Sequence, residues 1–336
     1  MMKSPITDKE MTLRRETRTL TFRKEEFQVL YHYYLCTDSG EQFTSTELDE
    51  INLIQLYNEY RQKYNLPFPD EIKTIREKYE LSAVKMSEAL GFGVNIYRNY
   101  ENGEVPNESN GKLLKLANDP RIFREIVEQS AVLDQQKKEV LLATIDTVRT
   151  EEKHSHFIIE LEKYLLGSNL PNELTGYKRP SLKILTEMVV FFTERLQPWK
   201  TKLNKLLFYA DFACFRQTCF SISGIQYRAI DMGPVPNNFN SIFEYIANKD
   251  DVDVYRTEFP NGGLGEQFKP NPKRKFKQKV FTEHELKILN IIVETFASTS
   301  TEDIIQISHK EKAWKENFEQ GKRLISYKYG FELEAI

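Results

Sequence analysis

The spacing of apolar residues changes along the chain, and each change predicts a different element. Between residues 12 and 47, apolar and β-branched residues alternate with polar ones, most clearly in FQVLYHYYL. This alternation predicts two or three antiparallel strands, with a turn at residues 38–40. Between residues 45 and 64, apolar residues recur every three to five positions, which predicts a helix with Thr46 as its N-cap. Pro67 and Pro69 then end that helix, because proline lacks a backbone donor.

Short helices joined by loops of a few residues are predicted next, at residues 70–80, 82–90, 94–102 and 103–119. A charged helical stretch follows and continues through residue 166. Residues 167–180 contain two glycines and two prolines, so we place the main domain boundary there.

The remaining residues, 181–336, form a second domain that the pattern predicts to be mostly helical. Apolar residues repeat at three and four positions in five segments: 181–196, 201–218, 241–249, 283–298 and 300–308. The fold class is therefore mainly α with a small N-terminal antiparallel β region. We divide the chain into a β and helix region (1–65), a compact helical domain (66–130), a connector (131–180) and a second domain (181–336).

Composition narrows the class of protein. The 336 residues are 40% hydrophobic and carry a formal net charge of −3, so two or three domains with real cores are expected and the protein is no polycation. The chain has neither an apolar run of about 18 residues nor an apolar segment near its start, so we expect a cytoplasmic protein without a membrane partner. Three cysteines and five dispersed histidines indicate neither a disulfide framework nor a metal site.

Residues 81–106 have the layout of a helix-turn-helix: a short helix, a turn at Gly91-Phe92-Gly93 and a second short helix closed by Asn102-Gly103. The residues expected to pack are Ala83, Met86, Ala89 and Leu90 on the first helix, and Val94, Ile96 or Tyr97, and Tyr100 on the second. Asn95, Arg98 and Asn99 are then left pointing outward, and asparagine and arginine pair with adenine and guanine edges. A helical hairpin without DNA contacts has the same spacing.

The segment GFGVNIYRNYENG resembles the Xre-type helix-turn-helix of the MqsA antitoxin family. The resemblance implies that Asn95 reads DNA. The family's second reader, an arginine four residues later, is Asn99 here, and Arg98 lies one place early. Residues 70–119 contain seven Lys and Arg against nine acids, so non-specific affinity for phosphates should be poor unless a dimer concentrates the basic residues.

Residues 1–65 resemble the zinc-ribbon half of the same family, but they hold one cysteine, Cys36. Because a structural zinc needs four ligands, we interpret this region as a metal-free remnant or an unrelated β meander, with Cys36 as a small buried hydrophobic residue.

Residues 201–239, which include TKLNKLLFYADF and DMGPVPNNF, and the later segment ISHKEKAW resemble the Panacea domain, also called the SocA-type antitoxin domain. The resemblance spans about 150 residues, close to the whole second domain. In it, Gly233 permits unusual dihedral angles in a turn, and Pro234 and Pro236 fix the direction in which the chain leaves it. The resemblance implies family-motif or toxin-binding roles for Tyr209, Asp231, Gly233, Pro234, Val235, Pro236, His309 and Trp314.

An enzyme is the weaker interpretation of the same residues. His309, Asp211 and Asp231 form a conceivable acid–base set, and Cys214 or Cys219 a conceivable nucleophile. Both cysteines lie in an aromatic helical segment where neutral buried thiols are usual. We therefore predict no catalytic residues, no cofactor and no enzymatic activity.

The basic segment 267–280 is either a contact for nucleic acid or an acidic partner, or a solvated loop; we favour the loop. Its basic residues are Lys269, Lys273, Arg274, Lys275, Lys277 and Lys279. Residues 261–265 are interpreted as a flexible glycine-rich loop.

Together the two resemblances imply the antitoxin of a type II toxin–antitoxin pair. Its partners would be a cognate protein toxin and operator DNA, and it would form a homodimer or a toxin–antitoxin hetero-oligomer. The expected toxin-contact surface combines the glycine–proline turn at residues 231–238 with the loop 259–280. A transcriptional regulator without a toxin and a proteolytic adaptor remain as alternatives.

Overall fold

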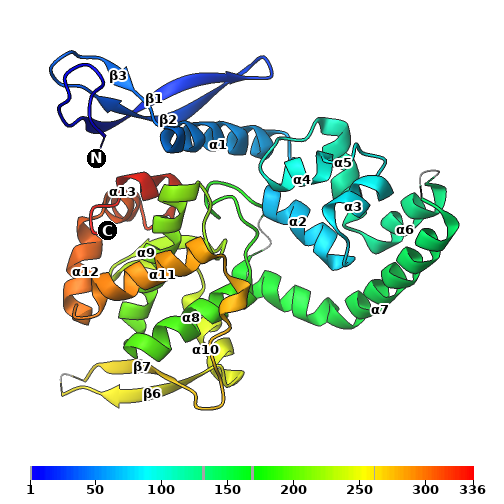
Figure 1. The fold of residues 1–336 in the computed structure, drawn as a ribbon. Helices are drawn as coiled ribbons and strands as arrows, with labels where there is room; N and C mark the ends of the chain where they lie inside the picture. The colour runs from blue at the N-terminus through cyan, green and yellow to red at the C-terminus, as the bar shows by residue number, and fades with distance from the viewer. Residues whose placement is uncertain (1, 131–132, 168–169, 261) are drawn as a thin grey trace. The chain divides into compact units, whose positions relative to one another are not determined.

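The computed structural model describes residues 2–130, 133–167, 170–260 and 262–336, with backbone only at residues 153–157. Residues 131–132 and 168–169 of the predicted connector and residue 261 of the predicted loop lie outside this description. The chain separates into two compact units, unit 1 (residues 1–156) and unit 2 (residues 157–336), and the division falls within a helix upstream of the predicted boundary (Figure 1). The fold is mainly α with small antiparallel sheets, which confirms the predicted class.

Unit 1 begins with a three-stranded antiparallel sheet in the order β1-β2-β3, followed by helices. Its elements are β1 (Thr12–Phe22), β2 (Glu25–Leu35), β3 (Gln42–Phe43), α1 (Thr46–Lys63), α2 (Pro69–Lys78), α3 (Ala83–Ala89), α4 (Ile96–Glu101), α5 (Glu108–Ala117), α6 (Pro120–Gln129) and the first part of α7 (Gln135–Leu166), whose last residues belong to unit 2. The predicted strands are confirmed. The predicted N-cap Thr46 is wrong by one residue, since the hydroxyl of Ser45 accepts from Leu48 N at 3.3 Å. Pro69 is the first residue of α2, a position that needs no backbone donor.

Helix α1 is joined to the sheet by apolar packing and by two side-chain amides. Phe27 and Val29 of β2 pack with Leu56 and Tyr60 of α1. Asn52 exchanges hydrogen bonds with the backbone of His32, and Gln55 with that of Leu30, at 2.8 to 3.1 Å. The amides thereby satisfy backbone groups on the side of β2 that faces away from β1, as a further strand would do.

Cys36, just after β2, is buried, as predicted, but its surroundings are polar. The hydroxyl of Thr7 lies 3.4 Å from its sulfur. Hydrogen bonds from Ser39, Ser4 and Thr7 lower the pKa of the thiol to about 6. The side chain is thus held by hydroxyl groups and differs from a simple hydrophobic residue.

Helices α2 to α7 share one apolar core. Its buried residues include Ile72, Tyr79, Met86, Leu114, Phe123 and Ile145. The predicted helical periodicity of residues 70–166 is confirmed, and α7 ends at Leu166 as expected.

Unit 2 is built around a single buried helix, α9. Its elements are α8 (Leu182–Leu196), α9 (Lys200–Thr218), β4 (Tyr227–Ile230), β5 (Gly233–Pro236), α10 (Phe239–Asn248), β6 (Val252–Glu258), β7 (Leu264–Pro270), η1 (Gln278–Val280), α11 (Glu283–Phe296), α12 (Thr301–Lys310), α13 (Lys312–Glu319), β8 (Leu324–Ile325) and η2 (Tyr327–Glu332). All residues from Lys202 to Phe215 of α9 are buried. The five helices predicted from periodicity are confirmed within two residues at each end.

Two small sheets in unit 2 differ from the prediction. The segment Gly233–Pro236, expected as a turn, is a strand at the edge of a sheet in the order β5-β4-β8. Proline is tolerated there because an edge strand needs ladder bonds on one side only. Residues 264–270, expected as loop, form β7, which pairs along its whole length with β6.

None of the helices in the described ranges is long and apolar enough to cross a membrane.

Candidate functional site

The predicted motif residues of unit 2 meet around the middle of α9. Lys205 is fully buried there, and its Nζ donates to the carbonyl oxygen of Pro234 at 3.0 Å. Burial lowers the pKa of Lys205 to about 7. The lysine therefore holds strand β5 against α9 through one buried hydrogen bond.

Gly233 allows this contact because it has no side chain. Its φ is +94°, in the region that favours glycine. A Cβ at this position would lie 2.5 Å from Lys205 Cε and 2.5 Å from Ser308 Oγ. The predicted need for a glycine is thus explained by conformation and by space, although the residue begins a strand.

His309 and Trp314 clamp α12 and α13 onto the β4–β5 hairpin. Their rings stack at 3.9 Å between centroids, and Trp314 Nε1 donates to Ile230 O at 2.8 Å. Burial and the nearby charge of Lys205 lower the pKa of His309, against a backbone hydrogen bond with Asp231. The lowered pKa favours the neutral ring, which suits ring stacking.

Tyr209 connects α9 with the C-terminal segment through Glu311. The Tyr209 hydroxyl donates to Glu311 Oε1 at 3.3 Å, and the backbone amides of Glu334 and Ala335 donate to the same carboxylate at 3.1 Å. Burial raises the pKa of Glu311. Sequence reasoning missed Glu311, although it lies inside the segment ISHKEKAW.

The carboxylate of Asp211 lies in a separate buried network of hydrogen bonds. Its carboxylate accepts hydrogen bonds from Ile222 N, Ser223 N, the Ser223 hydroxyl and the Tyr227 hydroxyl, all between 2.6 and 2.8 Å. Burial raises the pKa of Asp211, and these four donors oppose the shift. The group orders residues 222–227 and is already fully engaged with the protein.

The conceivable acid–base set therefore separates into three environments. Asp211 faces residues 222–227, whereas His309 stacks on Trp314. Asp231 is exposed, and its carboxylate pairs with Lys322 Nζ at 2.6 Å. The lysine's hydrogen bond lowers the pKa of Asp231. Each group has its own structural partners, and the three are not arranged as a catalytic set.

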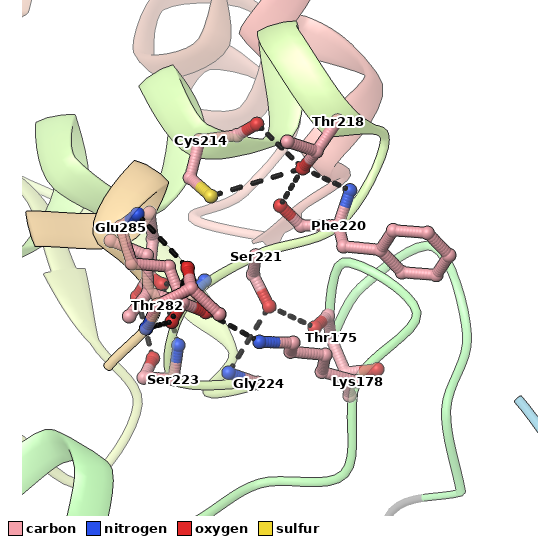
Figure 2. A network of polar contacts seen from close by, with 12 residues as sticks. Thr175, Lys178, Cys214, Thr218, Phe220, Ser221, Ser223, Gly224, Thr282 and Glu285 are labelled. Carbon is pink, nitrogen blue, oxygen red and sulfur yellow. Dashed lines mark hydrogen bonds and ion pairs between the residues drawn. The ribbon is translucent and has the colours of Figure 1, made fainter. Parts of the chain in front are cut away.

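The cysteines of unit 2 are buried, as predicted. The sulfur of Cys214 lies 3.8 Å from the hydroxyl of Thr218, which donates to Cys214 O at 2.9 Å. Figure 2 shows both contacts. Burial raises the pKa of Cys214 to about 12 and also raises that of Cys219. Cys219 lies just past α9, as its C-cap at φ +59°, and not within the helix. Neither thiol has the properties of a nucleophile.

The segment before α8 is fixed to the start of α11 in the same region. Lys178 Nζ pairs with Glu285 Oε1 at 2.7 Å, and Glu285 also forms a capping box with Thr282 (Figure 2). The Ser221 hydroxyl donates to Thr175 O at 2.8 Å. These contacts show that residues 175–178 are part of the folded unit.

An open groove of about 730 Å³ lies elsewhere on unit 2, between the hairpin β6–β7 and the starts of α9, α10 and α12. The rings of Trp199 and Phe259 pack at 5.4 Å between centroids, over Gly265. A Cβ on Gly265 would lie 2.6 Å from Phe259 and 2.7 Å from Trp199. The groove therefore depends on this glycine, which the sequence assigned to a loop.

The groove combines apolar side chains with paired charges. Leu264 is 77% exposed, and Phe259 39%. On the polar side, Glu266 pairs with Lys200 at 2.6 Å and with Arg256 at 3.2 Å. Exposed apolar groups beside oriented charges are typical of protein-binding surfaces.

The predicted basic segment is partly structural. Arg274 pairs with Asp251 and Glu187 and is mostly buried. Lys269 lies in β7 with its Nζ 4.5 Å from the centre of the Tyr255 ring, whereas Lys273, Lys275, Lys277 and Lys279 are exposed. The favoured interpretation as a solvated loop fits residues 271–277, which precede η1.

In unit 1, the three predicted DNA-contact residues lie at α4: Asn95 is its N-cap, and Arg98 and Asn99 lie within the helix. Asn95, Arg98 and Asn99 are exposed, as expected. Helix α4 is anchored through Tyr97, whose N donates to the Ser87 hydroxyl at 3.1 Å and whose hydroxyl donates to Ile72 O at 2.7 Å. The expectation that Val94 packs inward is wrong, since it is 62% exposed and precedes the first turn of α4.

Comparison with known proteins identifies part of unit 2. Residues 203–315 match the family model described as Antitoxin SocA-like, Panacea domain. The match runs from α9 to α13 and includes Lys205, Asp211, Gly233 and Trp314. It confirms the resemblance of this segment, whereas the resemblance of unit 1 to the MqsA family stays a prediction. No curated protein and no solved structure matches the chain.

Proposed function

We propose that the protein is an antitoxin that binds and neutralises a cognate protein toxin through unit 2 and represses its own operon through α3 and α4 of unit 1. The observation that carries the proposal is the match of residues 203–315 to the SocA-like antitoxin domain. The mode of action is recognition, because the buried acids, the lysine and the thiols of unit 2 are committed to internal contacts.

The toxin-contact surface proposed here is the groove beside β6 and β7. Gly233, Pro234, Val235 and Pro236 are buried, so they support the fold and leave little surface for a partner. Leu264 and Phe259 are exposed, and burying one large apolar side chain contributes about 1.5–3 kcal/mol. The charges of Lys200, Arg256 and Glu266 at the rim would orient the bound toxin.

Growth of a host that expresses the neighbouring small gene, with and without this protein, tests the antitoxin role. We expect toxicity that co-expression relieves, and a complex that co-purifies. If the product of the neighbouring gene were not toxic, we would instead assign this protein as a transcriptional regulator. A partner that disappears by degradation would move it to a proteolytic adaptor.

The groove is tested by replacing Leu264 and Phe259 with alanine. Because hot-spot residues dominate interfaces, we expect the double variant to bind the toxin roughly tenfold or more weakly. Leu170→Ala is the matched control, since Leu170 is 56% exposed in unit 2 and does not line the groove. Equal toxin affinity of a folded double variant and wild type would reject the groove.

The DNA-binding part of the proposal rests on the exposed polar residues of α4 and its N-cap. Asn95→Ala and Arg98→Ala should each cost on the order of 1–3 kcal/mol on operator DNA, because both side chains would contact base edges. Val94→Ala is the control, as it removes an exposed apolar group beside them. Fluorescence anisotropy with the upstream DNA of the operon measures the change, and unaltered affinity of both variants would remove α4 from the DNA interface.

A further inference from the structure

Strand β1 is a long edge strand in unit 1. It pairs with β2 at every position from Thr12 to Phe22, and the order β1-β2-β3 gives it one strand neighbour. The other side of β2 is covered by β3 and by the amides of Asn52 and Gln55. At one edge of the sheet, side chains and β3 thus bond to the backbone of β2. The other edge of the sheet is β1.

An edge of this length is a template for a further strand, and proteins usually protect such edges with proline, bulges or short strands. Strand β1 has none of these: its eleven residues lack proline and pair with β2 without a bulge. Thr17, Thr19 and Thr21 are exposed β-branched residues on one face. The charges of Arg14, Arg15, Glu16 and Arg18 restrict the registers in which a second strand can pair with β1.

We infer that β1 pairs antiparallel with β1 of a second copy of this chain, about a two-fold axis at Thr17. In this register Glu16 lies opposite Arg18 of the second copy, and the same pair forms again by symmetry. Arg14 then faces Leu20, and Arg15 faces Thr19. No two like charges are opposed.

Neighbouring registers are unfavourable. A symmetric antiparallel ladder places one residue opposite its own copy, so the axis must pass through a residue. An axis at Glu16 opposes two glutamates and sets Arg14 against Arg18, and an axis at Arg15 or Arg18 opposes two arginines. Within one chain Arg18 already lies 2.6 Å from Glu16. The register at Thr17 therefore joins two such pairs into a cluster of alternating sign.

Cysteine cross-linking of the full chain tests both the pairing and its register. Directly opposed residues have Cα atoms about 4.5–5.5 Å apart, within the range of a disulfide. Thr17→Cys should therefore give a covalent dimer under mild oxidation. The control Thr19→Cys lies on the same face, but its copies would be about 14 Å apart, so its yield should be about tenfold lower. The native cysteines are buried, and the wild type measures their background.

Charge reversal provides the second test, read as molar mass by light scattering. Glu16→Arg should shift the chain toward monomer in the micromolar range, and adding Arg18→Glu should restore the dimer. Glu26→Arg, an equal charge change on β2, should leave the dimer intact. A monomeric wild type, or equal cross-linking at positions 17 and 19, would overturn the inference. The experiment needs neither toxin nor DNA, so its outcome is independent of the proposed function.

Discussion

Two regions of unit 2 use the same kinds of residue in opposite ways. Around α9, Lys205, Asp211 and Glu311 are buried and His309 is partly buried, and all are bonded to or stacked on the protein itself. In the groove beside β6 and β7, charges and aromatic rings are partly exposed. The antitoxin-family match covers both regions, since most residues that line the groove also lie between residues 203 and 315. The motif residues around α9 mark what the fold must bury, whereas the groove that we propose as the partner-binding surface is exposed.

Replacing Asp211 with alanine is the strongest test of this difference. Four donors would lose their acceptor inside unit 2, which should lower the free energy of unfolding by about 4 kcal/mol. Asp231→Ala, which removes an exposed carboxylate, should cost less than about 0.5 kcal/mol. Urea unfolding followed by tryptophan fluorescence measures both, because Trp199 and Trp314 both lie in unit 2. If Asp211→Ala were stable but failed to bind toxin, the residues around α9 would contact the partner. The difference between the two regions would then be wrong.

Gly233→Ala comes next in expected size. The new Cβ would meet Lys205 and Ser308 at 2.5 Å, and the backbone would be strained at φ +94°. Overpacking and strain together should cost about 3 kcal/mol.

The matched control is Gly262→Ala. Gly262 also has a positive φ, +79°, but among the described residues no atom beyond its chain neighbours lies within 4 Å of the position that an alanine methyl group would take. Only the backbone strain of about 1 kcal/mol should therefore remain. Equal losses in the two variants would mean that the contact of β5 with Lys205 contributes nothing to stability.

The helices of both units could be predicted from the sequence, because their apolar residues recur with the period of a helix and their ends carry strong caps. Ser300 caps α12, and Thr282 and Glu285 form a capping box at α11. The hairpin β6–β7 escapes prediction because most of β6 is exposed and shows no alternation of burial. Its available signal is the turn sequence Pro260-Asn261-Gly262-Gly263 between two β-prone segments.

The candidate site could be predicted in part. The motif residues around α9 are identified through resemblance, and the outward direction of Asn95, Arg98 and Asn99 follows from helical spacing. The burial of Lys205 could not be predicted, because it depends on a carbonyl 29 residues away that only the folded chain brings near. The strand at Gly233–Pro236 is predicted as a turn because two prolines argue against a strand unless its edge position is known.

The pH dependence of the free energy of unfolding gives the test with the smallest expected effect. It reports on the burial of one residue, Lys205. Its pKa is lowered to about 7 in the folded protein, whereas the unfolded chain keeps the usual value of 10.5. Between these values the unfolded state binds more protons, so the free energy of unfolding rises with pH. From pH 7 to about pH 8.5 this lysine alone should contribute a gain of about 1.5 kcal/mol. The cysteines also titrate in this range, and their contribution is common to wild type and variants.

Lys205→Met should remove this rise, because methionine fills similar space without a titrating group. Lys273→Met is the control, since Lys273 is exposed and its loss should leave the slope unchanged. Urea unfolding at a series of pH values measures the slope in each variant. Equal slopes in wild type and Lys205→Met would show that the lysine reaches solvent. The region around α9 would then resemble the groove, in which charged side chains are partly exposed.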